Sequence, residues 1–126
     1  MIETLQMDSP KTIGFKLSGK LHDQDYQSFV PTVETFLAAE GKVRLFVQFD
    51  DFHGWDLHAV WDDFKFSLKH YGDFQRIAMV GDRKWQAWMA QVCKPFTKAT
   101  VRYFEAAQVD DARAWLREGV EPTSTV

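Results

Sequence analysis

The sequence of 126 residues lacks most features of extracellular, membrane-spanning and nucleic-acid-binding proteins. Its single cysteine, Cys93, excludes an internal disulfide and a zinc site built from cysteines. Lys and Arg number 15 against 18 Asp and Glu, without a basic stripe, so nucleic acid is not an expected partner. No apolar run is long enough to span a bilayer, and residues 1–11 lack the regions of a signal peptide. These absences favour a cytoplasmic protein.

Common catalytic and phosphate-binding motifs are also missing. There is no Gly-rich phosphate loop and no His-Glu-x-x-His pair, and no nucleophile elbow is present. A cluster of acidic and histidine side chains does occur between residues 50 and 63, with His58 and Asp62 at i, i+4 spacing. A metal-dependent enzyme using Asp50, His53 and His58 is therefore one alternative. The sequence contains no recognised three-ligand pattern, and we expect no enzymatic activity, no metal and no cofactor.

Aromatic residues are what the sequence has in excess, with eleven Phe, five Trp and three Tyr. The length is typical of one domain, and 45% apolar residues are enough for a core. We expect a single domain over residues 1–119. Residues 120–126 are polar and are expected to form a flexible tail.

Hydrophobic periodicity predicts strands that alternate with helices. Strands are expected at residues 12–21, 43–49, 76–80 and 100–104, with a short partner strand within residues 1–7. Helices are expected from Asp23 to Gly41, and at residues 56–70, 82–94 and 109–117. Pro31 lies within the first of these, so that helix is either kinked there or begins its regular part there. This order predicts an α/β fold with a mixed, mostly parallel sheet of about five strands and about four helices.

The predicted helix at residues 56–70 carries an apolar stripe typical of a core-facing surface. Its members are Leu57, Val60, Trp61, Phe64, Leu68 and Tyr71. At 100° per residue, Phe66 falls on the opposite side, in line with Ala59 and the entry residue Trp55. We therefore expect Trp55 and Phe66 to lie on an outer face, where they would contact a membrane or a protein partner.

The predicted helix at residues 82–94 and the residues just after it carry a second stripe, formed by Trp85, Trp88, Met89, Val92 and Phe96. Indole and thioether groups adapt well to irregular apolar neighbours. Such a stripe is more often core than ligand site. The alternative is that the two aromatic helices enclose an apolar pocket. Their spacing does not distinguish these interpretations.

Several short motifs occur in an order that resembles the SpoIIAA-like family of small bacterial domains. They are Gly54-Trp55, Trp61-Asp62-Asp63-Phe64, Arg76-Ile77-Ala78-Met79-Val80-Gly81-Asp82, Trp85, Val101-Arg102-Tyr103-Phe104, Ala112 and Trp115-Leu116. The resemblance extends from about residue 2 to 119. It implies the STAS-type α/β fold, which is also compared with lipid-binding Sec14-like (CRAL-TRIO) domains, so it implies an apolar ligand or membrane contact.

The resemblance also implies a difference from anti-sigma-factor antagonists. Those proteins carry a phosphorylatable Ser or Thr just after the central strand, at the start of the next helix. Here residues 50–56 read Asp-Asp-Phe-His-Gly-Trp-Asp and contain no hydroxyl. A phosphate cannot switch the domain at this place.

Our leading hypothesis is a non-enzymatic domain that binds a lipid-like or other apolar small molecule between the two aromatic helices, with peripheral contact to the inner membrane. The expected lining residues are Trp61, Phe64, Leu68, Trp85, Trp88, Met89, Val92 and Phe96. The alternative is a STAS-type protein–protein interaction module without the serine switch, acting through the same helices and open to homodimerisation.

Overall fold

The computed structural model describes residues 1–7, 11–70, 72–82, 90–91, 94 and 98–118. Within these ranges the side chains of seven residues are outside the description: Trp55, Leu57, Val60, Trp61, Phe64, Ser67 and Leu68. All statements about structure below concern the described part of the chain.

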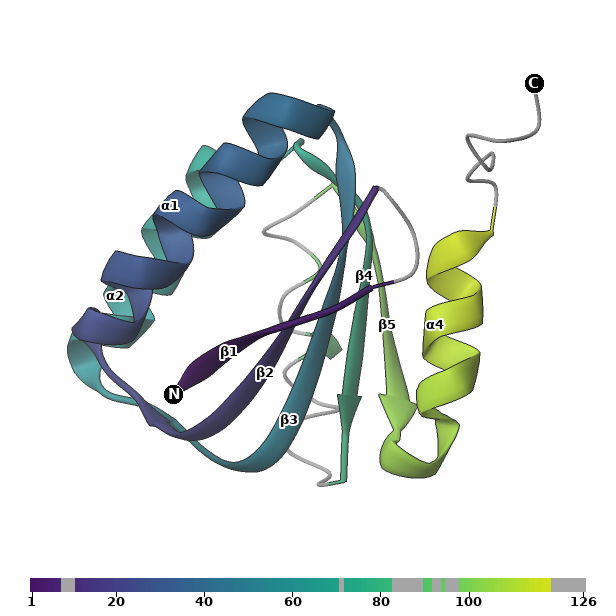
Figure 1. The fold of residues 1–126 in the computed structure, drawn as a ribbon. Helices are drawn as coiled ribbons and strands as arrows, with labels where there is room; N and C mark the ends of the chain where they lie inside the picture. Colours follow the sequence, from purple (N-terminus) through teal and green to yellow (C-terminus); the bar gives the residue numbers. More distant parts are fainter. Residues whose placement is uncertain (8–10, 71, 83–89, 92–93, 95–97, 119–126) are drawn as a thin grey trace.

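A five-stranded mixed sheet forms the centre of the fold (Figure 1). Its strands are β1 (Ile2–Leu5), β2 (Thr12–Leu21), β3 (Val43–Trp55), β4 (Phe74–Gly81) and β5 (Thr100–Glu105). They lie in the order β1-β2-β3-β4-β5. Strand β1 is antiparallel to β2, and the remaining pairs are parallel. The predicted α/β class and mostly parallel sheet are therefore confirmed.

Helices cover both faces of this sheet. Helices α1 (Asp23–Glu40) and α2 (Leu57–Lys69) lie side by side on one face, and α4 (Val109–Arg117) lies on the other (Figure 1). A 3-10 turn, η2 (Ala106–Gln108), leads into α4. The described residues thus contain fewer helices than the four expected, and most of the helix predicted at residues 82–94 lies outside them. No helix in the described ranges is long and apolar enough to cross a membrane.

The two faces have separate cores because successive strand residues point to opposite sides. From β3, Leu45 and Val47 belong to the core under α1 and α2, whereas Phe46 belongs to the core under α4. Helix α1 closes the first core with Phe29, whose ring centroid lies 4.7 Å from that of Phe15. This helix runs unbroken through Pro31, so its regular part does not begin at the proline.

Strand β3 continues six residues beyond its predicted end, to Trp55. The acidic pair at residues 50–51 suggested a loop, but Phe52 is fully buried and pairs with Gly19 of β2. The strand accommodates register shifts against β2 at Gly19. Gly54 has φ of 105°, a conformation that favours glycine. Burial of Phe52 therefore outweighs the low strand propensity of aspartate.

The outward orientation expected for Phe66 is wrong. Phe66 is only 9% exposed and packs on Phe29 and Phe74, with ring centroids 5.4 and 6.3 Å away. Ala59, on the same side of α2, is fully buried. Apolar residues occur around most of the circumference of α2. The helical periodicity of its sequence therefore does not determine whether Phe66 faces the core.

The C-terminal ends of α1 and α2 are joined by a small polar network. Lys69 donates to Glu34 at 2.5 Å. His70 is buried between Phe66 and Asp73, with Nδ1 2.6 Å from the Asp73 carboxylate. These contacts fix the two helices to each other at the end remote from their first turns.

Candidate functional site at the start of helices α1 and α2

The first turns of α1 and α2 lie beside each other because of the sheet topology. Strands β2 and β3 are parallel neighbours, and their last residues, Leu21 and Trp55, are register partners. The backbone N–H of Asp56 donates to the carbonyl of Leu21 at 2.9 Å. Both helices therefore begin at the carboxyl edge of the sheet, the edge where open α/β sheets place their ligands.

One hydrogen bond between side chains joins the two helix starts. His22 is the N-cap of α1 and Asp56 is the N-cap of α2. The imidazole Nδ1 of His22 lies 2.6 Å from Oδ2 of Asp56, and Oδ1 of Asp56 accepts from the N–H of Ala59 at 2.8 Å. The Ala59 hydrogen bond and then His22 lower the pKa of Asp56. Asp56 is thus a fixed negative charge at the start of α2.

A second contact between the two helices brings together two carboxyl groups, those of Asp23 in α1 and Asp62 in α2. A hydrogen bond to the Asp23 carboxyl, followed by burial and the Asp23 charge, raises the pKa of Asp62. Lys65 lies 3.8 Å from Asp62 and partly offsets this effect. Oδ2 of Asp62 is buried and has no hydrogen-bond partner among the described residues. Asp62 therefore holds a proton more readily than an isolated aspartate does.

The third feature is a buried carboxyl beneath this surface. Tyr26 is 5% exposed, and its hydroxyl donates to Oδ1 of Asp63 at 3.1 Å. Burial raises the pKa of Asp63 to about 6, although the Tyr26 hydrogen bond opposes the rise. Asp63 therefore changes its charge close to neutral pH and links α2 to α1.

The acidic and histidine residues of the sequence cluster do not converge on one point. Asp50 and His53 are exposed on β3, where Asp50 pairs with Lys16 at 3.6 Å and His53 lies 3.3 Å from Asp51. His58 is exposed on the first turn of α2. Within the described ranges no group of three or more such side chains is arranged to hold a metal ion.

The predicted apolar site falls largely on residues outside the description. Trp85, Trp88, Met89, Val92 and Phe96 lie outside the described residues. Trp61, Phe64 and Leu68 belong to α2 and Trp55 ends β3, but their side chains are not among those described. The lipid-lining role of these residues and the outer-contact role of Trp55 stay predictions.

Sequence reasoning missed two polar arrangements. The Tyr26–Asp63 pair was not predicted because Tyr26 fits the apolar spacing of α1. Only the structure shows that its hydroxyl is buried and donates to a carboxylate.

The second arrangement is an arginine cluster at the end of α4. Arg76 donates to the Trp115 carbonyl at 2.7 Å and lies 5.0 Å from the Trp115 ring.

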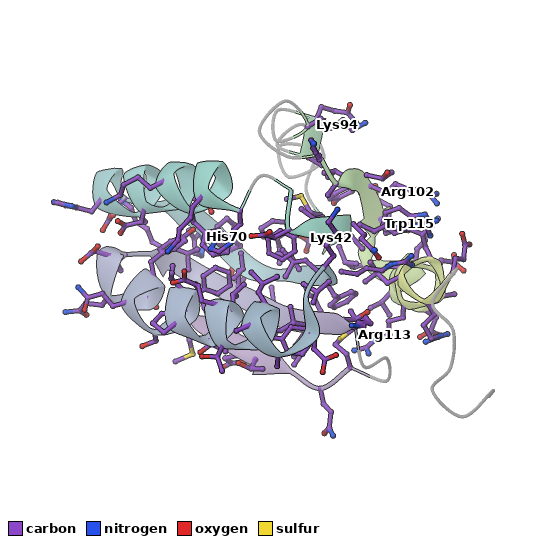
Figure 2. The ribbon with its side chains drawn as sticks, turned by 90° about the horizontal axis from the view of Figure 1, so that it is seen from above. Lys42, His70, Lys94, Arg102, Arg113 and Trp115 are labelled. Carbon is purple, nitrogen blue, oxygen red and sulfur yellow. The ribbon has the colours of Figure 1, made fainter. Side chains whose placement is uncertain are left out.

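The same cluster includes Arg44, which is 7% exposed and donates to the carbonyls of Leu116 and Glu118. The carbonyls at a helix C-terminus lack intrahelical donors, so the buried arginine stabilises α4. Figure 2 shows Arg102, Trp115 and Arg113 gathered around α4, away from His70. An arginine near the start of each of the strands β3, β4 and β5 gives a faint sequence signal for such a cluster: Arg44, Arg76 and Arg102.

Two solved structures resemble this fold. A protein of the DUF3478 family with a SpoIIAA-like fold, from Shewanella loihica PV-4, is 33% identical, with a TM-score of 0.77 and 92% of each chain covered. The anti-sigma factor antagonist SpoIIAA in its unphosphorylated form has a TM-score of 0.58 at 10% identity, covering 88% of this chain and 96% of its own. The second likeness shows the fold alone. No curated protein matches.

The family comparison covers nearly all of this fold, from the first residue of β2 to the last of α4. The SpoIIAA-like family model matches residues 12–117. The matched range includes the shared start of α1 and α2, both cores and the arginine cluster. The chain belongs to the SpoIIAA-like family.

Proposed function

We propose that this chain is a non-enzymatic regulatory domain of STAS type, which binds a partner protein through the surface where α1 and α2 begin. The observation that carries this proposal is Asp56. It stands at the start of the helix after the central strand, the place where the family resemblance puts a phosphorylatable hydroxyl in the antagonists. Here a carboxylate with a lowered pKa holds that place. A reversible phosphate is thus replaced by a permanent negative charge.

The charge of the surface indicates what kind of partner it fits. Asp23, Asp25 and Asp56 surround the first turns, and Asp50 and Asp51 extend the acidic area along β3. The basic groups within 4 Å of these carboxylates are the N-terminal amine, Lys16, His22 and His53. The partner is therefore expected to present Lys and Arg side chains, with an association rate that falls as salt rises.

Photo-crosslinking tests where the partner binds. A photoreactive amino acid replaces Gln24 or His58, both exposed in the first turns of α1 and α2. The matched control replaces Lys42, which is exposed just before β3, at the amino end of that strand. One discrete crosslinked protein from Gln24 and His58, and none from Lys42, is expected in living cells. The same product from all three positions, or none from either site position, would contradict the proposal.

The second candidate function is binding of a lipid-like or other apolar small molecule. The aromatic excess on two consecutive predicted helices still favours it at the sequence level, and no described contact supports it. Native mass spectrometry of protein purified from cells would reveal a bound lipid, and liposome flotation would reveal membrane association. A stoichiometric lipid together with flotation would replace the protein-binding proposal as the leading function.

A further inference from the structure

Strand β5 is the last strand of the described sheet. Strand β4 is its one partner among the described strands, so its outer edge presents N–H and C=O groups that another strand can use. Val101 and Phe104 are buried in the cores on opposite faces of the sheet, whereas Thr100, Arg102 and Glu105 are exposed. The edge is short and carries both apolar and charged side chains.

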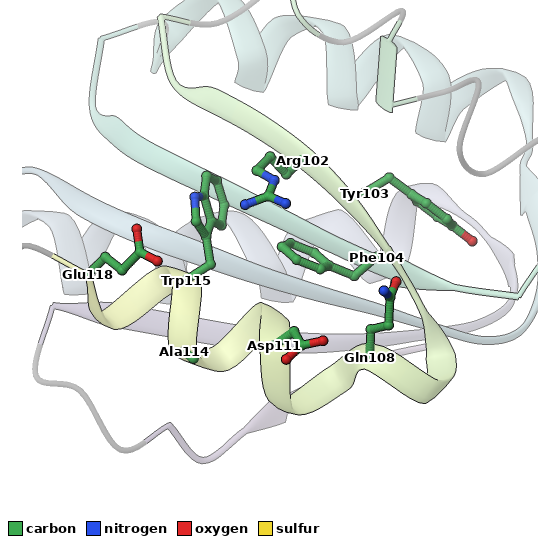
Figure 3. A pocket seen from close by; sticks show the side chains of 8 residues that line it. All are labelled: Arg102, Tyr103, Phe104, Gln108, Asp111, Ala114, Trp115 and Glu118. Carbon is green, nitrogen blue, oxygen red and sulfur yellow. The ribbon is translucent and has the colours of Figure 1, made fainter.

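A groove of about 500 Å³ runs between β5 and α4 (Figure 3). The helix starts at the carboxyl end of β5 and runs back alongside it (Figure 1). The groove has an aromatic floor and charged walls. It is lined by Arg102, Tyr103, Phe104, Gln108, Asp111, Ala114, Trp115 and Glu118.

One cation and one anion that line the groove have no ion-pair partner among the described residues. The guanidinium of Arg102 lies 4.8 Å from the Phe104 ring and 5.3 Å from the Trp115 ring. Those rings hold Arg102 in place. Within the described part of the chain, neither Arg102 nor Asp111 forms an ion pair, whereas Glu118 is paired with Arg76 at 3.2 Å. An arginine ordered by two rings is prepared to bind a carboxylate.

We propose that the occupant of this groove is a second copy of the chain, which pairs antiparallel with β5 across a two-fold axis. A two-fold axis perpendicular to the sheet keeps both α4 helices on one face. It can place Tyr103 opposite Tyr103 of the partner and Arg102 opposite the partner's Phe104. Phe104 lies at the strand end from which α4 starts, so the partner's Asp111 comes close to Arg102.

The symmetry favours a second copy over an unrelated peptide. A two-fold interface is self-complementary, so each Arg102 meets an Asp111 and each Asp111 meets an Arg102. An acidic peptide would satisfy Arg102 and leave Asp111 facing negative charge. The interface extends one sheet across both copies, and it leaves the start of α1 and α2 free for the partner proposed above.

Sedimentation equilibrium with a charge swap tests this directly. The wild type is expected to form a dimer as concentration rises. R102E and D111K each break two symmetric ion pairs and should lower the association constant about tenfold. The double variant R102E/D111K restores both pairs in reverse and should recover most of that loss. D110K, at the exposed neighbouring position of α4, is the matched control and should dimerise like the wild type.

Thermal unfolding of each variant establishes that it is folded before its association is compared. Hydrogen exchange supplies an independent readout, since amides of β5 should gain protection with concentration while those of β1, the opposite edge, should not. A wild type that stays monomeric would overturn the proposal. A folded double variant as weak as the single variants would also overturn it.

Discussion

The buried carboxyl of Asp63 leads to the sharpest quantitative prediction. Its pKa is about 6 in the folded protein, against an ordinary aspartate value near 4 in the unfolded chain. The folded state therefore binds an extra proton between about pH 4 and pH 6. Because a raised carboxyl pKa favours the folded state only while the proton is bound, this contribution to the unfolding free energy is present below about pH 4. It is lost as pH rises through 6.

The size of the loss follows from the shift. About two pKa units correspond to about 3 kcal/mol between acidic pH and pH 7. The variant Asp63→Asn keeps an oxygen to accept from Tyr26 but cannot ionise. Relative to wild type, it should gain stability progressively from pH 4 to 7, by about 2 to 3 kcal/mol at the plateau.

Urea unfolding of wild type and Asp63→Asn at several pH values measures this difference. Tyr26→Phe is the companion variant, because it removes the hydrogen bond that lowers the pKa and should move the wild-type transition to higher pH. The reasoning is refuted if the difference between wild type and Asp63→Asn is the same at pH 4 and pH 7.

Three further predictions concern individual contacts. Asp56→Ala should destabilise the protein at pH 7 through loss of the N-cap, and Asp56→Asn should destabilise it much less. Because the pKa of Asp56 is lowered, the charge-dependent part of this effect should disappear as pH falls below about 4. An equal loss of stability for both variants in urea unfolding would contradict the capping role. Arg44→Met should cost about 1.5 to 3 kcal/mol, because it leaves the last carbonyls of α4 without donors; unchanged thermal stability, with normal exchange protection in α4, would argue against that. Phe66→Ala should cost about 3 to 5 kcal/mol as a core truncation, whereas a loss below 1 kcal/mol would return Phe66 to an outer face.

Much of the sheet was predictable because strand periodicity and turn residues agree along the chain. The boundaries of β2 and α4 match the alternation and spacing of their own residues. Strand β3 was predicted too short because its last six residues are held by pairing with β2 and by burial of Phe52. Local propensity does not contain that information.

The candidate site was predicted less well. The sequence marked the acidic cluster and the absence of a hydroxyl after the central strand, and both remain central. The register of β2 against β3 brings His22 to Asp56, 34 positions later in the chain. No local pattern links such residues. The outward orientation of Phe66 was predicted wrongly, because α2 carries apolar residues on several sides and only the packing of Phe66 against Phe29 shows that it is buried.

The central claim is that a basic partner protein binds where α1 and α2 begin. The most direct measurement is the affinity of the partner identified by crosslinking, compared by calorimetry for wild type and Asp56→Asn. This substitution keeps the N-cap but removes the charge. We expect weaker binding by Asp56→Asn at equal stability, and a smaller difference at high salt. Equal affinity of the two proteins at low salt would contradict the account.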